Sequence, residues 1–146
     1  MAVVSSIKSL KTPLRYPGGK SRACKKMDPY IPDLRNYDSY YEPFLGGGSV
    51  AIHITKKYPH LKINVSDLYE PLYNFWVCLQ KRGEQMASEL NKLKSSHSTP
   101  DLAKELFLES KKIINDEDKG RLDRAIAFYI VNKCSFSGLT ESRSEE

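Results

Sequence analysis

Apolar residues in the first half of the chain follow the pattern of two short strands. Tyr40, Tyr41 and Phe44 form one aromatic run, and Ile63 and Val65 form a second, shorter apolar run. Short runs of aromatic and β-branched residues that end at glycine or aspartate are typical of strands. The sequence therefore predicts strands around residues 40–44 and 63–65, with a further candidate near residues 3–7.

In the second half, the apolar positions recur at helical spacing. They indicate four helical segments, with a break at Gly83 between the first two and Pro71 in the first turn of the first. The apolar positions are Leu68, Leu72, Phe75, Trp76 and Leu79 in the first segment, Met86, Leu90 and Leu93 in the second, Leu102, Leu106 and Ile113 in the third, and Leu122, Ala125, Ile126, Tyr129 and Ile130 in the fourth. This order predicts an α/β protein whose strands come first.

A triple-glycine bend joins the first strand to a helix. Gly46, Gly47 and Gly48 precede a helix start in which Ser49 is expected near the cap. Strand, glycine turn and helix present backbone N–H groups to a ligand beyond the carboxyl end of the strand. The spacing lacks the third glycine of the dinucleotide fingerprint, and no Gly-Lys-Ser/Thr follows, which excludes a P-loop.

An acidic residue follows the second strand at a spacing that changes the interpretation of this bend. Asp67 lies 19 residues after Gly48, and a carboxylate at the end of the next strand can accept both hydroxyls of a ribose. A glycine-rich surface turn is the alternative for the bend alone. The acidic partner favours a nucleoside site.

A second glycine-containing loop comes earlier, from Thr12 to Lys20, before a basic helix candidate at residues 21–27. Its Tyr16, Gly18, Gly19 and Lys20 could close over a planar ring while the lysine meets a carboxylate. A turn with a solvated lysine is the simpler interpretation of this loop alone. Asp28 is interpreted as a turn or cap former. The histidines are interpreted as solvated loop residues: His53, His60 and His97.

Composition narrows the class only slightly. The 146 residues suffice for one compact domain, and the net charge of +5 suits a polyanion partner, although many other proteins are equally basic. The three cysteines are far apart, and no Cys-x-x-Cys or His-x-x-His pair offers a metal site, so we expect no metal. No stretch approaches a membrane span. We expect a soluble protein of the reducing cytoplasm.

Together these segments resemble the N-terminal half of a Dam-like, S-adenosylmethionine-dependent DNA adenine methyltransferase. The matching elements, in order, are Leu14-Arg15-Tyr16-Pro17-Gly18-Gly19-Lys20, Glu42-Pro43-Phe44-Leu45-Gly46-Gly47-Gly48-Ser49, Ser66-Asp67-Leu68 and the segment from Asn132 to Leu139. The resemblance implies a partial Rossmann-like sheet in residues 1–82. It also implies that residues 83–146 are a helical segment like the start of a target-recognition domain.

The resemblance also implies site residues. The cofactor, S-adenosylmethionine, is expected at Tyr16, Gly18, Gly19, Lys20, Glu42, Pro43, Phe44, Gly46, Gly48, Ser49 and Asp67. Double-stranded DNA is expected at Asn132, Lys133, Phe136, Leu139 and Arg143. Within the last segment, Lys133 replaces the family's arginine and loses its bidentate fork, Ser137 replaces an asparagine, and Glu141 stands where an arginine is expected.

The expected activity is methyl transfer to the exocyclic amine of adenine. The family's catalytic Asp-Pro-Pro-Tyr motif does not occur in these 146 residues, so no catalytic residue is assigned and the chain is expected to be inactive alone. A sheet of this size leaves an edge open to a second polypeptide or to self-association. The alternatives are a non-catalytic regulator, decoy or split-enzyme subunit that binds the cofactor or DNA, and a basic DNA-binding domain whose glycine bend is only structural.

Overall fold

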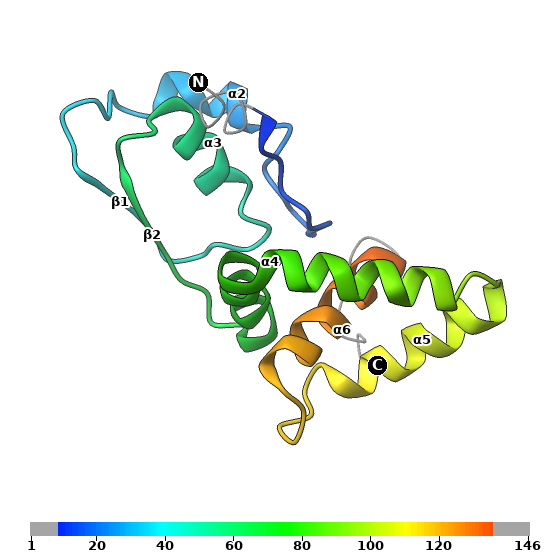
Figure 1. Ribbon diagram of the computed structural model, residues 1–146. Helices are drawn as coiled ribbons and strands as arrows, with labels where there is room; N and C mark the ends of the chain where they lie inside the picture. Colours follow the sequence, from blue (N-terminus) through cyan, green and yellow to red (C-terminus); the bar gives the residue numbers. More distant parts are fainter. Residues whose placement is uncertain (1–8, 136–146) are drawn as a thin grey trace, which may run out of the picture. The chain divides into compact units, whose positions relative to one another are not determined.

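The computed structural model describes residues 9–135 and shows a mixed α/β chain, mostly helical (Figure 1). Residues 1–8 and 136–146 lie outside the described part, and with them the candidate strand near residues 3–7. The chain divides into two compact units, Met1–Leu68 and Tyr69–Glu146. The functional division expected between residues 82 and 83 stays a prediction.

The first unit holds a two-stranded parallel sheet. Its elements are α2 (Cys24–Met27), the 3-10 turn η1 (Asp28–Tyr30), β1 (Ser39–Glu42), α3 (Ser49–Lys57) and β2 (Lys62–Val65). The strands pair in the register Ser39↔Lys62 to Glu42↔Val65, with α3 as the crossover. Both predicted strands are confirmed, and helix α2 is shorter than the predicted residues 21–27.

A small apolar core lies between the sheet and α3. Ile54, Tyr58 and Leu61 are buried there, and the register partners Tyr40 and Ile63 pack against them. Side chains alternate between the faces of a strand, so Tyr41 belongs to the opposite face, where it is 72% exposed. Helix α3 therefore covers one face of this sheet.

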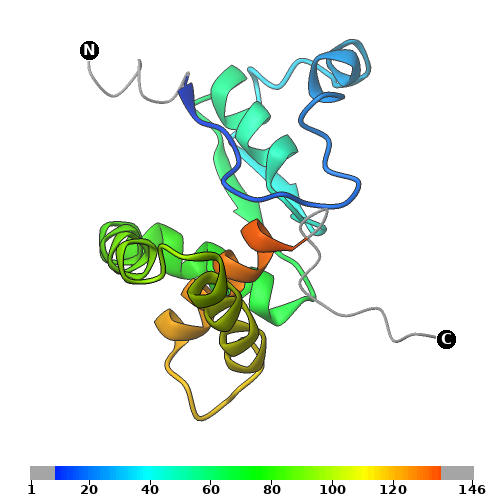
Figure 2. The ribbon, with the colours of Figure 1, turned by 90° about the vertical axis from the view of Figure 1, so that its right-hand side faces the viewer.

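The second unit consists of α4 (Glu70–Ser96), α5 (Pro100–Ile113) and α6 (Arg121–Cys134), with α6 packed against the other two (Figure 2). The first two predicted helices share the label α4, but they meet at a kink where Arg82 has a non-helical conformation (φ −139°, ψ 29°), so the predicted break at Gly83 is confirmed to within one residue. Thr99 caps α5 by accepting a hydrogen bond from the Leu102 N–H. Between residues 9 and 135, no helix is both long enough and apolar enough to span a membrane.

The core of the second unit is aromatic and includes specific polar contacts. Phe75 is 1% exposed, and its ring centroid lies 5.6 Å from that of Phe128. Asn74 is fully buried and donates from Nδ2 to the Arg121 carbonyl at 2.8 Å. Arg124 pairs with Glu70 and also donates to the Ile114 carbonyl. The Asn74 and Glu70 contacts hold the start of α6 against the start of α4, and the Ile114 contact holds it against the end of α5.

Candidate functional site

The bend between β1 and α3 is held by backbone hydrogen bonds to the chain that leaves β2. Ser66 N–H donates to the Glu42 carbonyl and Leu45 N–H to the Ser66 carbonyl, each at 3.0 Å. Gly46 and Gly48 adopt φ of +51° and +70°, a left-handed conformation that costs other residues about 1–2 kcal/mol. The glycines are therefore required by the path of the chain.

The predicted helix start, with Ser49 near the cap, is confirmed. Gly48 is the N-cap of α3 and makes no side-chain cap bond. Ser49 is the first residue of the helix, and its hydroxyl is hydrogen-bonded to that of Ser21 at 2.7 Å. The left-handed Gly48 completes the bend. The Ser49 hydroxyl connects α3 to Ser21, in the segment before α2.

Tyr16 lies directly over the glycine bend. A Cβ added at Gly47 would lie 2.8 Å from the Tyr16 Cβ, and one at Gly46 would lie 3.1 Å from an edge atom of its ring. The Thr12 hydroxyl donates to the Gly47 carbonyl and accepts from the Leu14 N–H. The two glycine-containing loops, more than 20 residues apart in the sequence, thus form one structure.

A cavity of about 190 Å³ lies where these loops meet. The predicted cofactor residues that line it are Tyr16, Gly18, Gly19, Lys20, Glu42, Phe44, Gly46 and Ser49. Pro17, Leu45, Gly47 and Val50 also line it, although they were not among the expected cofactor residues. Pro43, Gly48 and Asp67 are not in the cavity wall. Their role in cofactor binding stays a prediction.

Asp67 is bonded to the bend itself. Its Oδ2 accepts a hydrogen bond from the Gly46 N–H at 2.9 Å. A carboxylate that accepts from a backbone N–H in a tight turn stabilises the turn. Asp67 therefore helps to hold the bend in shape, and ribose binding would be a second task.

Glu42 is the acidic group of the cavity. Burial raises the pKa of its carboxyl, and the hydrogen bond from the Tyr40 hydroxyl at 3.2 Å opposes that rise. Burial and the nearby Glu42 charge raise the pKa of Tyr40 to about 12, so the phenol stays a donor. A half-buried carboxylate of this kind attracts a cationic ligand, which would replace part of its lost hydration.

Two apolar side chains next to the bend are strongly exposed. Phe44 is 81% exposed and Leu68, directly after Asp67, is 96% exposed. Most large apolar residues are at least half buried. The spacing of Leu68 predicts a place in the first helical segment, but this residue lies before α4, in the first unit. The sequence signal that the helical spacing leaves out is the position of Leu68 directly after Asp67.

The predicted DNA segment begins at the end of α6. Asn132 is only 1% exposed, within the packed helical unit. The Lys133 ammonium lies 5.4 Å from the centroid of the Tyr129 ring. Phe136, Leu139 and Arg143 lie outside the described residues. Contact of this segment with DNA stays a prediction.

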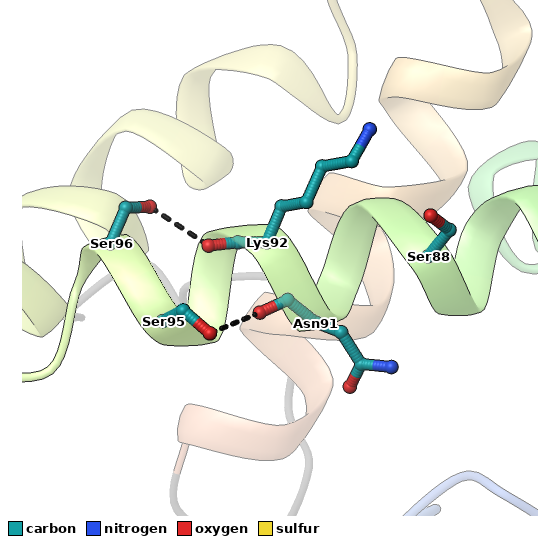
Figure 3. A pocket seen from close by; sticks show the side chains of 5 residues that line it. All are labelled: Ser88, Asn91, Lys92, Ser95 and Ser96. Atoms are coloured by element: carbon teal, nitrogen blue, oxygen red, sulfur yellow. Dashed lines mark hydrogen bonds between the residues drawn. The ribbon is translucent and has the colours of Figure 1, made fainter.

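Other hollows offer weaker chemistry. One hollow on the surface of α4 is formed by five residues of that single helix (Figure 3). Two of its hydroxyls donate to carbonyls of the same helix: Ser95 to Asn91 and Ser96 to Lys92. A groove of about 490 Å³ between α4, α5 and α6 is mainly aliphatic. Among residues 9–135, no three His, Cys, Asp or Glu side chains gather in a way that could hold a metal ion.

Comparison with known proteins identifies the family. Residues 16–146 match the model of the D12 class N6 adenine-specific DNA methyltransferases, and the chain belongs to this family. It is 28% identical over 136 residues to the type II methyltransferase M.MjaIII of Methanocaldococcus jannaschii. The match covers 86% of this chain and 46% of that protein. It is 27% identical over 126 residues to a DNA N-6-adenine-methyltransferase of Escherichia phage P1, again covering 86% of this chain but 15% of the relative. The chain thus spans less than half the length of either relative.

Proposed function

We propose that this chain binds S-adenosylmethionine at the glycine bend and forms the cofactor-binding part of an adenine-specific DNA methyltransferase. Family membership supports the reaction class. The observation that carries the proposal is the convergence of Tyr16, Lys20 and Glu42 on one cavity at the bend, whose Gly46 N–H is held by Asp67. These residues come from three separate parts of the sequence.

The charges of the cavity fit the amino-acid end of this cofactor. S-adenosylmethionine carries an ammonium, a sulfonium and a carboxylate. Glu42 would face the cationic groups and Lys20 the carboxylate, since both side chains line the cavity. In the structure, the Lys20 ammonium donates to the Gly18 carbonyl at 2.7 Å, a neutral partner that an anionic ligand would replace favourably.

The volume of the cavity limits what it can enclose. Its 190 Å³ is below the roughly 300 Å³ at which ligand pockets begin, so it would hold the amino-acid end rather than the whole cofactor. The nucleoside would lie outside it, where Phe44, which also lines the cavity, exposes apolar surface to cover a planar base. Asp67 would meet the ribose there.

In this function the cofactor supplies the methyl group on its sulfonium. The residues of this chain would bind and orient the donor, and the two parallel strands would form part of a larger Rossmann-like sheet. Double-stranded DNA would be the substrate, and the cytoplasm the compartment. A second polypeptide that supplies the catalytic motif would complete the activity if this chain acts as one part of a split enzyme.

Isothermal titration with S-adenosylmethionine tests the cofactor site. Asp67→Asn keeps an oxygen that can accept from Gly46 N–H but removes the charge that would favour the ribose hydroxyls, whereas Asp67→Ala removes both. We expect about tenfold weaker binding for Asp67→Asn, and a further loss for Asp67→Ala with a lower melting temperature. Asp38→Asn, an exposed change in the same unit, is the matched control. Unchanged affinity in both Asp67 variants would remove the proposed role of Asp67.

Methyl transfer tests the reaction itself. Radiolabelled methyl groups should appear on adenine in duplex DNA when the chain is supplied with S-adenosylmethionine and any partner it requires. Cofactor binding without transfer would instead indicate the binding-only regulator, decoy or subunit. Salt-sensitive DNA binding without cofactor binding would indicate a basic DNA-binding domain whose bend is structural.

A further inference from the structure

A second polar cavity lies in the first unit, beside the one at the glycine bend. It has a volume of about 380 Å³ and is formed by three parts of the chain: residues 10–12, the residues around the start of α2, and the face of α3 that carries Ser49, Ile52, His53 and Lys56. Ser49 lines both cavities. This volume lies within the range of about 300–1,000 Å³ that is usual for small-molecule sites.

The charged side chains that line this cavity, Lys11 and Lys56, are cationic. His53 also lines it, and no carboxylate does. Among the ion pairs of residues 9–135, none involves Lys11 or Lys56. The nearest elements add exposed Arg22, Lys25 and Lys26. Like charges at this density repel one another unless an anion lies between them.

Carboxylates near the cavity are already paired or belong to the other site. Asp28 accepts from His53 Nε2 at 2.8 Å and from Lys57 at 3.1 Å. These two partners hold the pKa of Asp28 below its usual value, so the carboxylate stays charged and keeps His53 in place. Burial is the main cause that raises the pKa of the Cys24 thiol, and the charges of Asp28 and Glu42 raise it further. Neither of these two carboxylates lines the cavity.

Hydroxyl groups complete the set of donors. Ser21 and Ser49 share one hydrogen bond of 2.7 Å, so one hydroxyl of the pair keeps a proton that it can donate to a ligand. The Thr12 hydroxyl is already used between the Gly47 carbonyl and the Leu14 N–H. Cys24 donates weakly to the Ser49 carbonyl at 3.7 Å, and burial keeps its thiol protonated by raising its pKa. Two ammonium groups and a hydroxyl suit a phosphate better than any cation.

We propose that the cavity formed by residues 10–12, the start of α2 and α3 is a phosphate site, and that Lys11 and Lys56 bind the phosphate oxygens. The phosphate belongs either to the DNA backbone or to a free phosphorylated small molecule. The DNA case rests on the proposed function, whereas the small-molecule case stands without it. Because Ser49 borders both cavities, a bound phosphate would lie next to the cofactor end of the bend.

Titration of the full 146-residue chain with inorganic phosphate, at constant ionic strength in chloride, tests the site. We expect Lys56→Gln and Lys11→Gln each to weaken phosphate binding about tenfold. Lys56→Arg keeps the charge and should retain most of the affinity. Lys62→Gln removes one exposed charge from β2, outside the cavity, and should leave it unchanged. Melting curves of each variant show whether it is folded.

Duplex DNA distinguishes the two sources of the phosphate. If the site holds a backbone phosphate, the slope of log K against log salt should become smaller by about 0.9 in Lys56→Gln and remain unchanged in Lys62→Gln. Weaker inorganic phosphate binding with an unchanged DNA slope assigns the site to a small phosphorylated molecule. Equal phosphate affinity and equal DNA slope in the wild type and both lining variants would overturn the proposal. Affinity for S-adenosylmethionine, measured on the same variants, reports separately on the cofactor site.

Discussion

The two compact units differ in charge and in the way their apolar side chains are used. The first unit, residues 1–68, has 11 Lys and Arg against 5 Asp and Glu, whereas the second, residues 69–146, has 12 against 13. The second unit buries Phe75 and Phe128 almost completely, while the first leaves Phe44 81% exposed. The basic character of the chain therefore belongs to the proposed cofactor unit and not to the helices expected to recognise DNA.

This difference shows where binding and stability are located. A helical unit with an aromatic core can be stable through its own packing, while exposed apolar and unpaired basic side chains are the usual marks of a binding surface. Net charge alone would have assigned polyanion binding to the chain as a whole. The division of charge between the units points instead to the first unit, which also contains the cavity at the glycine bend and the proposed phosphate site.

The largest effect is expected from truncation in the helical core. Phe75→Ala removes a ring that lies 5.6 Å from Phe128 and is stacked 5.9 Å from Tyr129. We expect the free energy of unfolding of this unit to fall by about 3–5 kcal/mol, measured by urea denaturation followed by circular dichroism. Leu108→Ala, at a side chain 48% exposed, is the control and should change it by less than about 0.5 kcal/mol. A small effect of Phe75→Ala would mean that the helical unit is not held by its core.

A glycine substitution is the sharpest way to alter the first unit without removing any polar group. Gly47→Ala brings a Cβ to 2.8 Å from that of Tyr16. Overpacking of this kind costs about 1–3 kcal/mol, and because Tyr16 must move from the bend, affinity for S-adenosylmethionine should fall about 10- to 100-fold. Gly83→Ala places its Cβ at an ordinary 3.8 Å from Leu79 and serves as the control. Calorimetric titration with S-adenosylmethionine measures the affinity of both variants. Equal affinities would show that the Tyr16 contact is irrelevant to binding.

Local patterns predicted the strands and the glycine bend, because these depend on neighbours in the sequence. The residues expected at the cavity came from the family resemblance instead. Side-chain contacts between distant residues that belong to no recognised motif were not predictable. The sequence indicates a solvated loop residue at His53, but this residue lies in α3 and is hydrogen-bonded to Asp28, 25 residues earlier. The separation of charge between the units is visible only once their boundary is known.

Glu42→Gln should separate binding from stability within the first unit. Burial raises the folded-state pKa of Glu42, so its ionisation costs stability as the pH rises above the ordinary value of 4.5. Glutamine keeps an acceptor for the Tyr40 hydroxyl without that cost. At pH 7 we therefore expect an equal or higher melting temperature, with cofactor affinity about tenfold lower because a charge-assisted contact is lost. Melting curves from pH 4 to 8 and calorimetric titration measure the two effects. A variant with unchanged affinity would contradict the role of Glu42.

The smallest effect is expected at the partly exposed ion pairs between η1 and α3, where Asp28→Asn removes the partner of His53 and Lys57. Those partners lower the folded-state pKa of Asp28 from 3.8, so the stability it contributes is present above pH 3.8 and is lost as the pH falls through the lowered value. We expect a slightly lower melting temperature for the variant at pH 7 and convergence with the wild type in acid. Asp33→Asn is the matched control: Arg35 lowers its pKa too, but that pair spans only two residues and can persist in the unfolded chain. A larger effect for Asp33→Asn than for Asp28→Asn would show that the contact between η1 and α3 does not stabilise the first unit.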